Sequence, residues 1–312
     1  MKKLLMSLGV FSLVFSIDVS HAQTITPTSL PTTTTTIPLW SQSYLASQHL
    51  DPLPIEQQDA NGAVSAVAVP RMLVSLPTHT NHMAILIISG GGYRHEKLAK
   101  EGTPAAQWLV QQGFTVFNLI YRLPADNWQD HLVPLADGQR ALRLIRQNAQ
   151  RYHYHQIGVM GFSAGGHLAG MLAVSSKHNF YSPQDATDNL SPRPDFVALL
   201  YPIVSMVSYP HHSQSFKQLL GSHSTPDEQK SLSIEQLVNK ETPPMFIAHA
   251  KDDPIAPVAD SIVLDDKLKQ SNIAQSLTLF DKGGHGWGLG KPNTPTMAWP
   301  ALFERWLKQT IN

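Results

Sequence analysis

A serine between closely spaced glycines is the first residue of this sequence whose setting points to chemistry. The segment Gly161-Phe162-Ser163-Ala164-Gly165 matches the pattern G-x-S-x-G. In that pattern the serine lies on a strained turn between a strand and a helix, where larger flanking residues would collide. An apolar stretch, QIGVMG, precedes the serine, and the small residues GGHLAGMLA follow it. We therefore predict that Ser163 is a nucleophile.

A serine hydroxyl becomes a good nucleophile only when a base takes its proton. In folds built around this motif the partners follow in the order serine, acid, histidine. His285 lies late in the chain in the segment DKGGHGWGLG, so it is expected on a loop from which it can reach Ser163. The acid should follow the preceding strand, Met245–Ala250, where both Asp252 and Asp253 stand. Spacing within this loop does not choose between the two.

A tetrahedral intermediate also needs hydrogen-bond donors aimed at its oxyanion. The backbone N–H of Ala164, directly after the serine, should supply one donor. Gly90-Gly91-Gly92 follows the strand-like run MAILIIS, and glycines there let the backbone approach a substrate because no Cβ intervenes. We expect the N–H groups of Gly91 and Gly92 to complete the oxyanion hole.

Seven motifs follow one another in an order that resembles a known family. From about residue 80 to the C-terminus these motifs are ISGGGYRH, LIYRLP, DGQRALRLIR, GVMGFSAGGHLAG, RPDFVALLYP, TPPMFIAHAKDDPIAP and DKGGHGWGLG. Together they resemble the bacterial α/β-hydrolase esterases described as acetyl xylan esterase-like, relatives of the hormone-sensitive-lipase and prolyl-oligopeptidase-like hydrolases. The resemblance implies that the acid lies four residues after His249, which closes its strand, and so favours Asp253. Ser89 departs from the pattern, since many hormone-sensitive-lipase relatives carry histidine there, and we expect this change to alter loop packing.

Polar and aromatic side chains flank the predicted site. Tyr93, Arg94 and His95 follow the glycines, and Trp287 follows the predicted base. Such groups can hydrogen-bond to a sugar or stack on it, so we place Tyr93, Arg94 and Trp287 at the rim of the substrate site. No long apolar segment follows Gly92. This disfavours a lipase, because each buried CH₂ of a fatty acid contributes only about 0.8 kcal/mol.

Strand-like and helix-like segments alternate from about residue 40 onward and must position these residues. This alternation predicts an α/β-hydrolase fold with a mostly parallel central sheet and helices on both faces. Two polar stretches, Tyr181–Arg193 and Ser205–Thr242, are expected to be excursions that shape a pocket. Apolar runs and helical periodicity predict strands at Met83–Ser89, Phe114–Tyr121, Gln156–Gly161, Phe196–Pro202, Met245–Ala250 and Ser276–Phe280, and helices at Ala105–Gln112, Pro134–Arg151, Gly165–Val174, Val258–Lys269 and Trp299–Lys308.

The N-terminus has the pattern of a secretory signal. Met1-Lys2-Lys3 is positively charged, residues 4–17 are apolar but too few to span a bilayer comfortably, and Ser20-His21-Ala22 offers small residues to signal peptidase. We predict a signal peptide over residues 1–22, a Thr/Pro-rich linker over 23–39 and a catalytic domain over 40–312. The protein is then secreted or periplasmic and has no membrane attachment after cleavage; the alternative is a retained anchor helix.

The composition excludes several classes of function. The 312 residues suit one large α/β domain, and 23 Lys and Arg balance 23 Asp and Glu, so no basic field is available for nucleic acid. There is no cysteine, which excludes disulfides, thiolate nucleophiles and Cys-based metal sites. The metalloprotease, P-loop and dinucleotide-binding motifs are absent from the sequence, and we expect neither a metal nor a cofactor.

The expected function is a serine esterase that hydrolyses small acyl esters through an acyl-enzyme. The resemblance implies acetylated plant sugars as substrates, either small molecules or oligosaccharides. One alternative is a prolyl-oligopeptidase-type serine peptidase, although the chain lacks the several hundred residues of the propeller that normally gates such a site. Further alternatives are a lipase and an inactive protein that keeps the fold for binding. The sequence specifies no oligomeric state.

Overall fold

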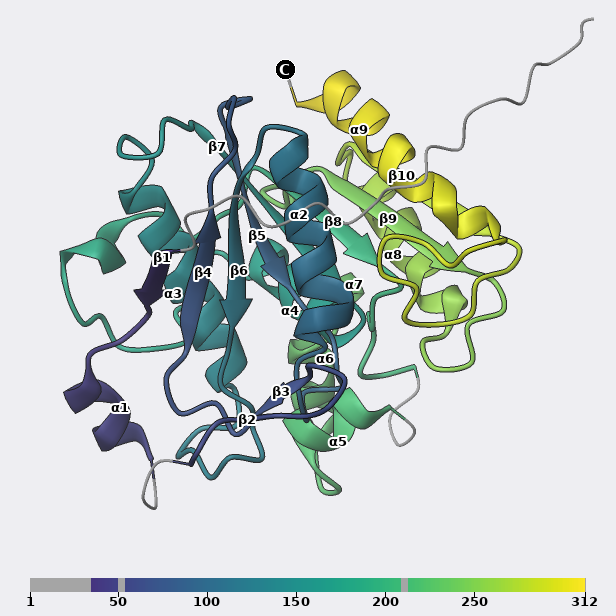
Figure 1. Ribbon diagram of the computed structural model, residues 1–312. Helices are drawn as coiled ribbons and strands as arrows, with labels where there is room; N and C mark the ends of the chain where they lie inside the picture. Colours follow the sequence, from purple (N-terminus) through teal and green to yellow (C-terminus); the bar gives the residue numbers. More distant parts are fainter. Residues whose placement is uncertain (1–34, 50–53, 209–212, 312) are drawn as a thin grey trace, which may run out of the picture. The chain divides into compact units, whose positions relative to one another are not determined.

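The computed structural model describes residues 35–49, 54–208 and 213–311 (Figure 1). The predicted signal peptide, residues 1–22, and the predicted linker up to residue 34 lie outside the described residues. The end of the predicted linker, however, is part of the fold. Thr35–Pro38 form β1, which pairs antiparallel with β4 (Arg71–Ser75), and Leu39 behind it is 1% exposed. The linker prediction is wrong for residues 35–39, because pairing with β4 and burial of Leu39 fix this segment to the sheet.

An eight-stranded sheet forms the centre of the described domain (Figure 1). Its strands lie in the order β1-β4-β6-β5-β7-β8-β9-β10. Neighbours from β6 to β10 are parallel, while β4 is antiparallel to both of its neighbours. The parallel part consists of β5 (Met83–Ile88), β6 (Thr115–Ile120), β7 (Gln156–Phe162), β8 (Phe196–Leu200), β9 (Met245–Ala250) and β10 (Gln275–Phe280).

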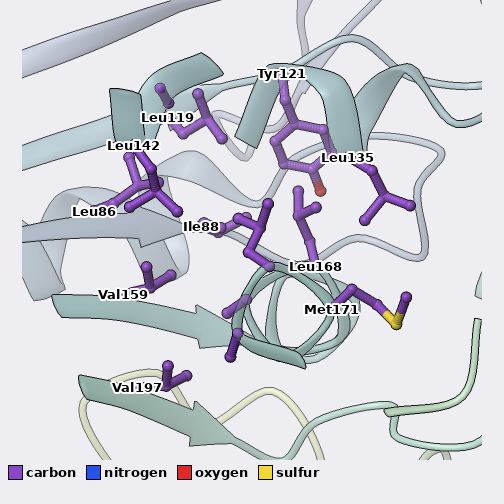
Figure 2. Close-up of a cluster of buried hydrophobic side chains, with 14 of the residues drawn as sticks. Leu86, Ile88, Leu119, Tyr121, Leu135, Leu142, Val159, Leu168, Met171 and Val197 are labelled. Atoms are coloured by element: carbon purple, nitrogen blue, oxygen red, sulfur yellow. The ribbon is translucent and has the colours of Figure 1, made fainter. Parts of the chain in front are cut away.

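Successive side chains of β5 enter two different hydrophobic cores. Ile85 and Ile87 belong to the cluster on one face of the sheet, and Leu86 and Ile88 belong to the cluster on the other. This follows from the alternation of side chains along a strand. Figure 2 shows the second cluster, in which side chains of β5 and β7 meet those of α4 (Ala164–Val174). Both faces are buried, as expected when helices cover a parallel sheet on both sides.

Five helices cover these two faces. The helices α3 (Val133–Gln147), α4 and α8 (Val258–Gln270) contribute to the cluster that contains Leu86, whereas α2 (Thr103–Gln111) and α9 (Trp299–Thr310) contribute to the cluster that contains Ile85. The helix predicted over Pro134–Arg151 ends at Gln147, and the side chain of Asn148 donates to Leu144 O at 2.8 Å beyond this end. The predicted α/β-hydrolase fold class is confirmed by this architecture.

Shorter elements surround the sheet. The described residues of the predicted excursion Ser205–Thr242 include three small helices, and the excursion Tyr181–Arg193 contains a 3₁₀ turn at Ala186–Asn189. In the described parts of the chain, no helix combines the length and the apolar character needed to cross a membrane. The small elements are α1 (Gln42–Gln48), α5 (Gln214–Leu220), α6 (Pro226–Ser231), α7 (Ile234–Leu237), β2 (Gln57–Gln58) and β3 (Val64–Ser65).

Candidate active site

Ser163 lies on a tight turn between β7 and α4. Its φ of 55° and ψ of −118° are values that a residue with a side chain adopts only under constraint. The flanking glycines make the turn possible. A Cβ on Gly161 would lie 2.2 Å from Gly165 O, and a Cβ on Gly165 would lie 2.2 Å from Ile88 O. The turn holds the serine at the carboxyl end of a central strand.

Three side chains from separate parts of the chain form one hydrogen-bonded series. Ser163 Oγ lies 2.7 Å from His285 Nε2, and His285 Nδ1 lies 2.7 Å from Asp253 Oδ2. Asp253 follows β9 and His285 follows β10, which are adjacent parallel strands. The Asp253 side chain is fully buried and that of His285 is 10% exposed. In this geometry the imidazole can accept the serine proton through Nε2 while the carboxylate holds the ring through Nδ1.

The two candidate acids make different contacts. Asp253 contacts His285, whereas Asp252 Oδ1 accepts the backbone N–H of Gly284 at 2.7 Å. The other oxygen of Asp253, Oδ1, accepts two backbone N–H groups of its own turn at 2.8 and 3.0 Å. These bonds fix the Asp253 carboxylate so that Oδ2 faces the imidazole. Asp252 instead supports the loop that carries His285.

A second histidine shares the Asp253 carboxylate. His249, in β9, is wholly buried; its Nε2 lies 3.2 Å from Asp253 Oδ2 and its Nδ1 lies 2.8 Å from Ser261 Oγ. Burial disfavours the Asp253 anion, but the hydrogen bonds from His249 and His285 outweigh it and hold the pKa of this carboxyl well below its usual range. Asp253 is therefore ionised at neutral pH. The sequence marked His249 only by its spacing, and this contact was missed.

The glycine run after β5 forms an open turn beside Ser163. Gly91 has a φ of 140° and Gly92 a φ of 66°, and a Cβ on Gly91 would lie 1.9 Å from His95 O. Only glycine fits this backbone. The N–H groups of Gly91 and Gly92 donate to no other residue in the part of the chain that the structure describes. They are thus available to a ligand, together with the predicted donor at Ala164.

The prediction that Tyr93 lies at the rim is wrong. Its side chain is 0% exposed, and its hydroxyl lies 2.8 Å from Nδ1 of the buried His167. The backbone at Tyr93 has a φ of 60°, and the ring packs edge-on against Tyr121. The core buries the large ring of Tyr93 and gives its hydroxyl a hydrogen-bond partner, which is a favourable position for a tyrosine. Tyr93 therefore supports the glycine turn from the core.

Trp287 is likewise not at the rim. Its side chain is 5% exposed, and its ring centroid lies 4.4 Å from that of Tyr201 and 6.1 Å from that of Phe280. Aromatic burial in the core under the His285 loop accounts for this position. Arg94, the third predicted rim residue, is exposed and lines the cavity that contains Ser163.

A buried carboxyl group connects the two loops of the site. Glu101 lies in a π-helical turn, Leu98–Gly102, and its Oε2 accepts the N–H of Gly90 at 2.7 Å. Tyr201 donates its hydroxyl to Glu101 Oε1 at 3.1 Å and accepts the N–H of Gly288 at 3.0 Å. Burial raises the pKa of Glu101, and this effect is larger than that of the hydrogen bond from Gly90 N–H, which lowers the pKa. No sequence motif marks Glu101, whose partners lie 11 and 100 positions away.

A cavity of about 250 Å³ opens over Ser163 and His285. Gly91, Gly92 and Arg94 line the cavity. Its other lining residues include Ile203, Gln214 and Ile255. Among the described residues, no group of three or more His, Asp or Glu side chains is placed to hold a metal ion. What the cavity offers a substrate is a hydroxyl, an imidazole and free backbone N–H groups.

Residues 73–268 match the model of the BD-FAE family. The chain belongs to the BD-FAE family. The predicted resemblance to acetyl xylan esterase-like α/β-hydrolases is thereby confirmed, since this family comprises α/β-hydrolase esterases. The match runs from within β4 to within α8; it therefore includes Ser163 and Asp253 and ends before His285.

Several proteins are similar to this BD-FAE member. The endo-1,4-beta-xylanase B of Butyrivibrio fibrisolvens is 36% identical over 208 residues, which are 65% of this chain and 32% of that protein. The acetylxylan esterase of Xylanibacter ruminicola is 31% identical over 226 residues, which are 70% of this chain and 44% of that protein. The aligned part is thus less than half of either relative. The crystal structure of an acetyl ester-xyloside bifunctional hydrolase from Caldicellulosiruptor lactoaceticus has a TM-score of 0.75 and 32% identity, covering 88% of this chain and 96% of that chain.

Proposed function

We propose that this BD-FAE member is a serine esterase that removes small acyl groups, above all acetyl, from sugars of plant origin. The observation that carries the proposal is the hydrogen-bonded series from Asp253 through His285 to Ser163, at 2.7 Å for each contact of the imidazole. The series ends in a cavity next to the N–H groups of Gly91 and Gly92, which donate to no other described residue. Acyl transfer needs this combination of nucleophile, base, orienting carboxylate and oxyanion donors.

In the first half of the reaction, Ser163 Oγ attacks the ester carbonyl as His285 Nε2 takes the hydroxyl proton. The ionised Asp253 keeps the ring in the tautomer with hydrogen on Nδ1 and stabilises the imidazolium that forms. The N–H groups of Gly91, Gly92 and Ala164 stabilise the oxyanion. The imidazolium then gives its proton to the departing sugar oxygen, which leaves an acyl-Ser163 ester.

In the second half, a water molecule takes the place of the sugar. His285 accepts a proton from this water as its oxygen attacks the acyl-Ser163 carbonyl. The same N–H groups stabilise the second oxyanion, and the imidazolium returns its proton to Ser163 Oγ. The products are a carboxylic acid, a free sugar hydroxyl and the regenerated site.

The size of the cavity supports a small acyl group. Its volume of about 250 Å³ is below the range of roughly 300–1,000 Å³ in which drug-sized ligands are bound. The names of the similar proteins, an acetylxylan esterase, a xylanase and an acetyl ester-xyloside hydrolase, support acetylated plant saccharides as the substrate class. Oligosaccharides fit the proposal because the exposed Arg94 lines the cavity and a second hollow shares His95 and Lys97 with it.

Export is part of the proposal. The signal-like residues 1–22 would direct the protein to the periplasm or the medium, where polysaccharide fragments are available. Mass spectrometry of the protein from its native cell envelope should find a chain that begins at Gln23. An intact Met1 on the mature protein would contradict export by cleavage.

A substrate panel tests the reaction itself. The purified protein is assayed on acetyl xylan, acetylated monosaccharides, p-nitrophenyl acetate, longer p-nitrophenyl esters and a prolyl amide. We expect acetyl esters to be hydrolysed fastest and the amide to be left intact. Faster cleavage of the prolyl amide would favour a peptidase instead, and failure to hydrolyse any ester would refute the proposal.

A further inference from the structure

Positively charged side chains gather at the mouth of the active-site cavity. Arg94 and Lys97 line the cavity together with Ser163. A second hollow, of about 490 Å³, adjoins the first by sharing Lys97 and adds Lys100. We call Arg94, Lys97 and Lys100 the cationic rim. Together the two hollows are large enough for more than the acyl group, so the sugar part of a substrate can extend along the rim.

The rim lies close to the reacting groups. A Cβ built on Gly286, the residue after His285, would be 3.7 Å from Lys100 Nζ. The ammonium group of Lys100 is therefore beside the loop of the base. Arg94 is two residues after Gly92, one of the proposed oxyanion donors. A substrate bound at Ser163 lies within reach of these cations.

Carboxylates in the neighbourhood compensate the rim only in part. Glu96 and Glu101 are buried and accept the backbone N–H groups of Tyr121 and Gly90; burial raises the pKa of both carboxyls, while the charge of Lys97 lowers the pKa of Glu101. Asp59 accepts two N–H groups of its own turn, at 2.8 Å each, and these bonds lower its pKa, so it is one anion beside the three cations.

The rim therefore carries a net positive charge. Among the residues that line the two hollows, Asp59 is the one carboxylate. Within the described residues, Arg94, Lys97 and Lys100 form no ion pair. Since the whole chain has a formal net charge of zero, this local excess is not a consequence of composition.

His95, between Arg94 and Lys97 in sequence, does not add to the charge. Its burial and the neighbouring Lys97 and Arg94 charges lower its pKa from the ordinary value of 6.5, so it is neutral at pH 7. A neutral imidazole can hydrogen-bond to a sugar hydroxyl. The site thus offers one polar group suited to a neutral sugar ring, and three cations with the single carboxylate of Asp59 among them.

We propose that the cationic rim binds a carboxylate on the sugar part of the ester, so that the preferred substrate is an acetylated oligosaccharide carrying a uronic acid. This rests on the proposed esterase function, because the rim recognises the alcohol side of the same substrate. A guanidinium binds a carboxylate through two parallel hydrogen bonds, and ammonium groups add charge attraction at short range. A neutral saccharide would leave the net positive charge of the rim unpaired next to the reacting ester.

Binding to an inactive protein tests the rim separately from catalysis. In a Ser163→Ala protein, calorimetry compares a deacetylated xylo-oligosaccharide with the same oligosaccharide bearing one glucuronic acid, and with free glucuronate. Each exposed charge pair is worth about 1.4- to 5-fold in Kd, so three pairs should give the acidic oligosaccharide about 10-fold tighter binding than the neutral one. Raising the ionic strength from about 0.01 M to about 1 M, which shortens the Debye length from about 30 Å to about 3 Å, should abolish this preference.

Two variants and one control complete the test. Adding Lys97→Met and Lys100→Met to the Ser163→Ala protein should reduce the preference for the acidic oligosaccharide at least about threefold. Adding Lys308→Met, at an exposed lysine of α9, should leave it unchanged. Equal binding of acidic and neutral oligosaccharides at low salt would overturn the proposal. So would a preference that survives loss of both lysines, or binding of glucuronate alone as tight as that of the acidic oligosaccharide.

Failure of this proposal is distinguishable from failure of the esterase function. In the wild-type protein, kcat/KM is measured on the acidic and the neutral acetylated oligosaccharide and on p-nitrophenyl acetate. Hydrolysis of all three at equal efficiency would uphold the esterase and overturn the rim. Tight binding of the acidic oligosaccharide without hydrolysis of any ester would uphold the rim's charge recognition and refute the esterase.

Discussion

Replacing Glu101 by glutamine changes the one carboxyl group that connects the glycine turn to the loop of His285. Glu101 accepts hydrogen bonds from Gly90 and from Tyr201, at 2.7 and 3.1 Å. Glutamine keeps the shape but turns one acceptor oxygen into an NH₂ donor. Whichever way the amide is oriented, one of the two donors loses its acceptor. A buried donor left unpaired costs about 1–3 kcal/mol, and small shifts of the two loops can relieve this cost.

Such shifts act on groups that meet the transition state. A misplacement of about 1 Å can lower a rate about 100-fold, so we expect Glu101→Gln to lower kcat/KM on p-nitrophenyl acetate by about 10- to 100-fold. The loss should lie mainly in kcat, because the oxyanion donors and His285 act on the transition state more than on bound substrate. Tyr201→Phe removes the hydroxyl that connects Glu101 to the N–H of Gly288. The double variant should be no slower than the slower single variant, because both changes break one network.

The assay is steady-state kinetics together with thermal melting of the wild type, the two single variants and the double variant. Glu235→Gln is a matched control, since Glu235 in α7 is also a buried carboxyl, 5% exposed, and lies outside the active-site loops. We expect the control to change the melting temperature without changing kcat. Additive effects of Glu101→Gln and Tyr201→Phe on log kcat/KM would refute the connection. An effect of Glu101→Gln on kcat no larger than that of Glu235→Gln would refute it as well.

Further predictions concern the hydrogen-bonded series and the cavity. Ser163→Ala should lower kcat by about 10⁶-fold while the protein stays folded; one tenth of the wild-type rate would contradict the assignment. Asp253→Asn should lower kcat by about 10⁴-fold and Asp252→Asn far less, and the reverse order would make Asp252 the acid. Because the pKa of Asp253 is lowered well below 3.8, the stability it confers is fully present above the unfolded pKa and is lost as the pH falls through the folded pKa, so the difference in urea unfolding between wild type and Asp253→Asn should begin to shrink below about pH 4 and vanish only at still lower pH. His249→Leu removes one of the two hydrogen-bond donors to Asp253 Oδ2. The acid limb of the pH profile of kcat/KM should then move to higher pH. His249→Gln keeps a donor and should leave the acid limb in place. Values of kcat/KM on p-nitrophenyl esters should be highest for acetate and fall through butyrate, octanoate and palmitate; a maximum at octanoate or beyond would indicate a lipase.

The sequence predicted the parallel strands and the main helices because each has a local signal. An apolar run such as MAILII is long enough to be recognised, and the structure begins β5 at the predicted Met83. The antiparallel strands lack such a signal. β4 alternates between buried and half-buried residues over only five positions, and β1 is part of a Thr/Pro-rich stretch. Both are fixed by hydrogen bonds to neighbours distant in sequence, which composition does not reveal.

The same distinction separates what could and could not be predicted of the site. The Ser163 turn depends in part on the steric contact between Gly161 and Gly165, four residues apart, which a short motif records. The direction of a side chain is different, since Tyr93 stands next to the glycines in sequence and yet turns into the core. Glu101 escaped prediction altogether, because it acts through Tyr201, 100 positions away. Contacts of this kind depend on the assembled fold rather than on local pattern.

Because Ser163 has a positive φ, the residue that is best for stability at this position differs from the residue that is needed for activity. Glycine adopts φ 55° without the penalty of about 1–3 kcal/mol that a residue with a Cβ incurs there. A search for thermostable variants that screens only for folded protein would therefore favour Ser163→Gly, which relaxes the backbone and destroys the nucleophile. Selection on turnover must act continuously at this codon to keep the less stable residue, as expected where activity depends on local strain.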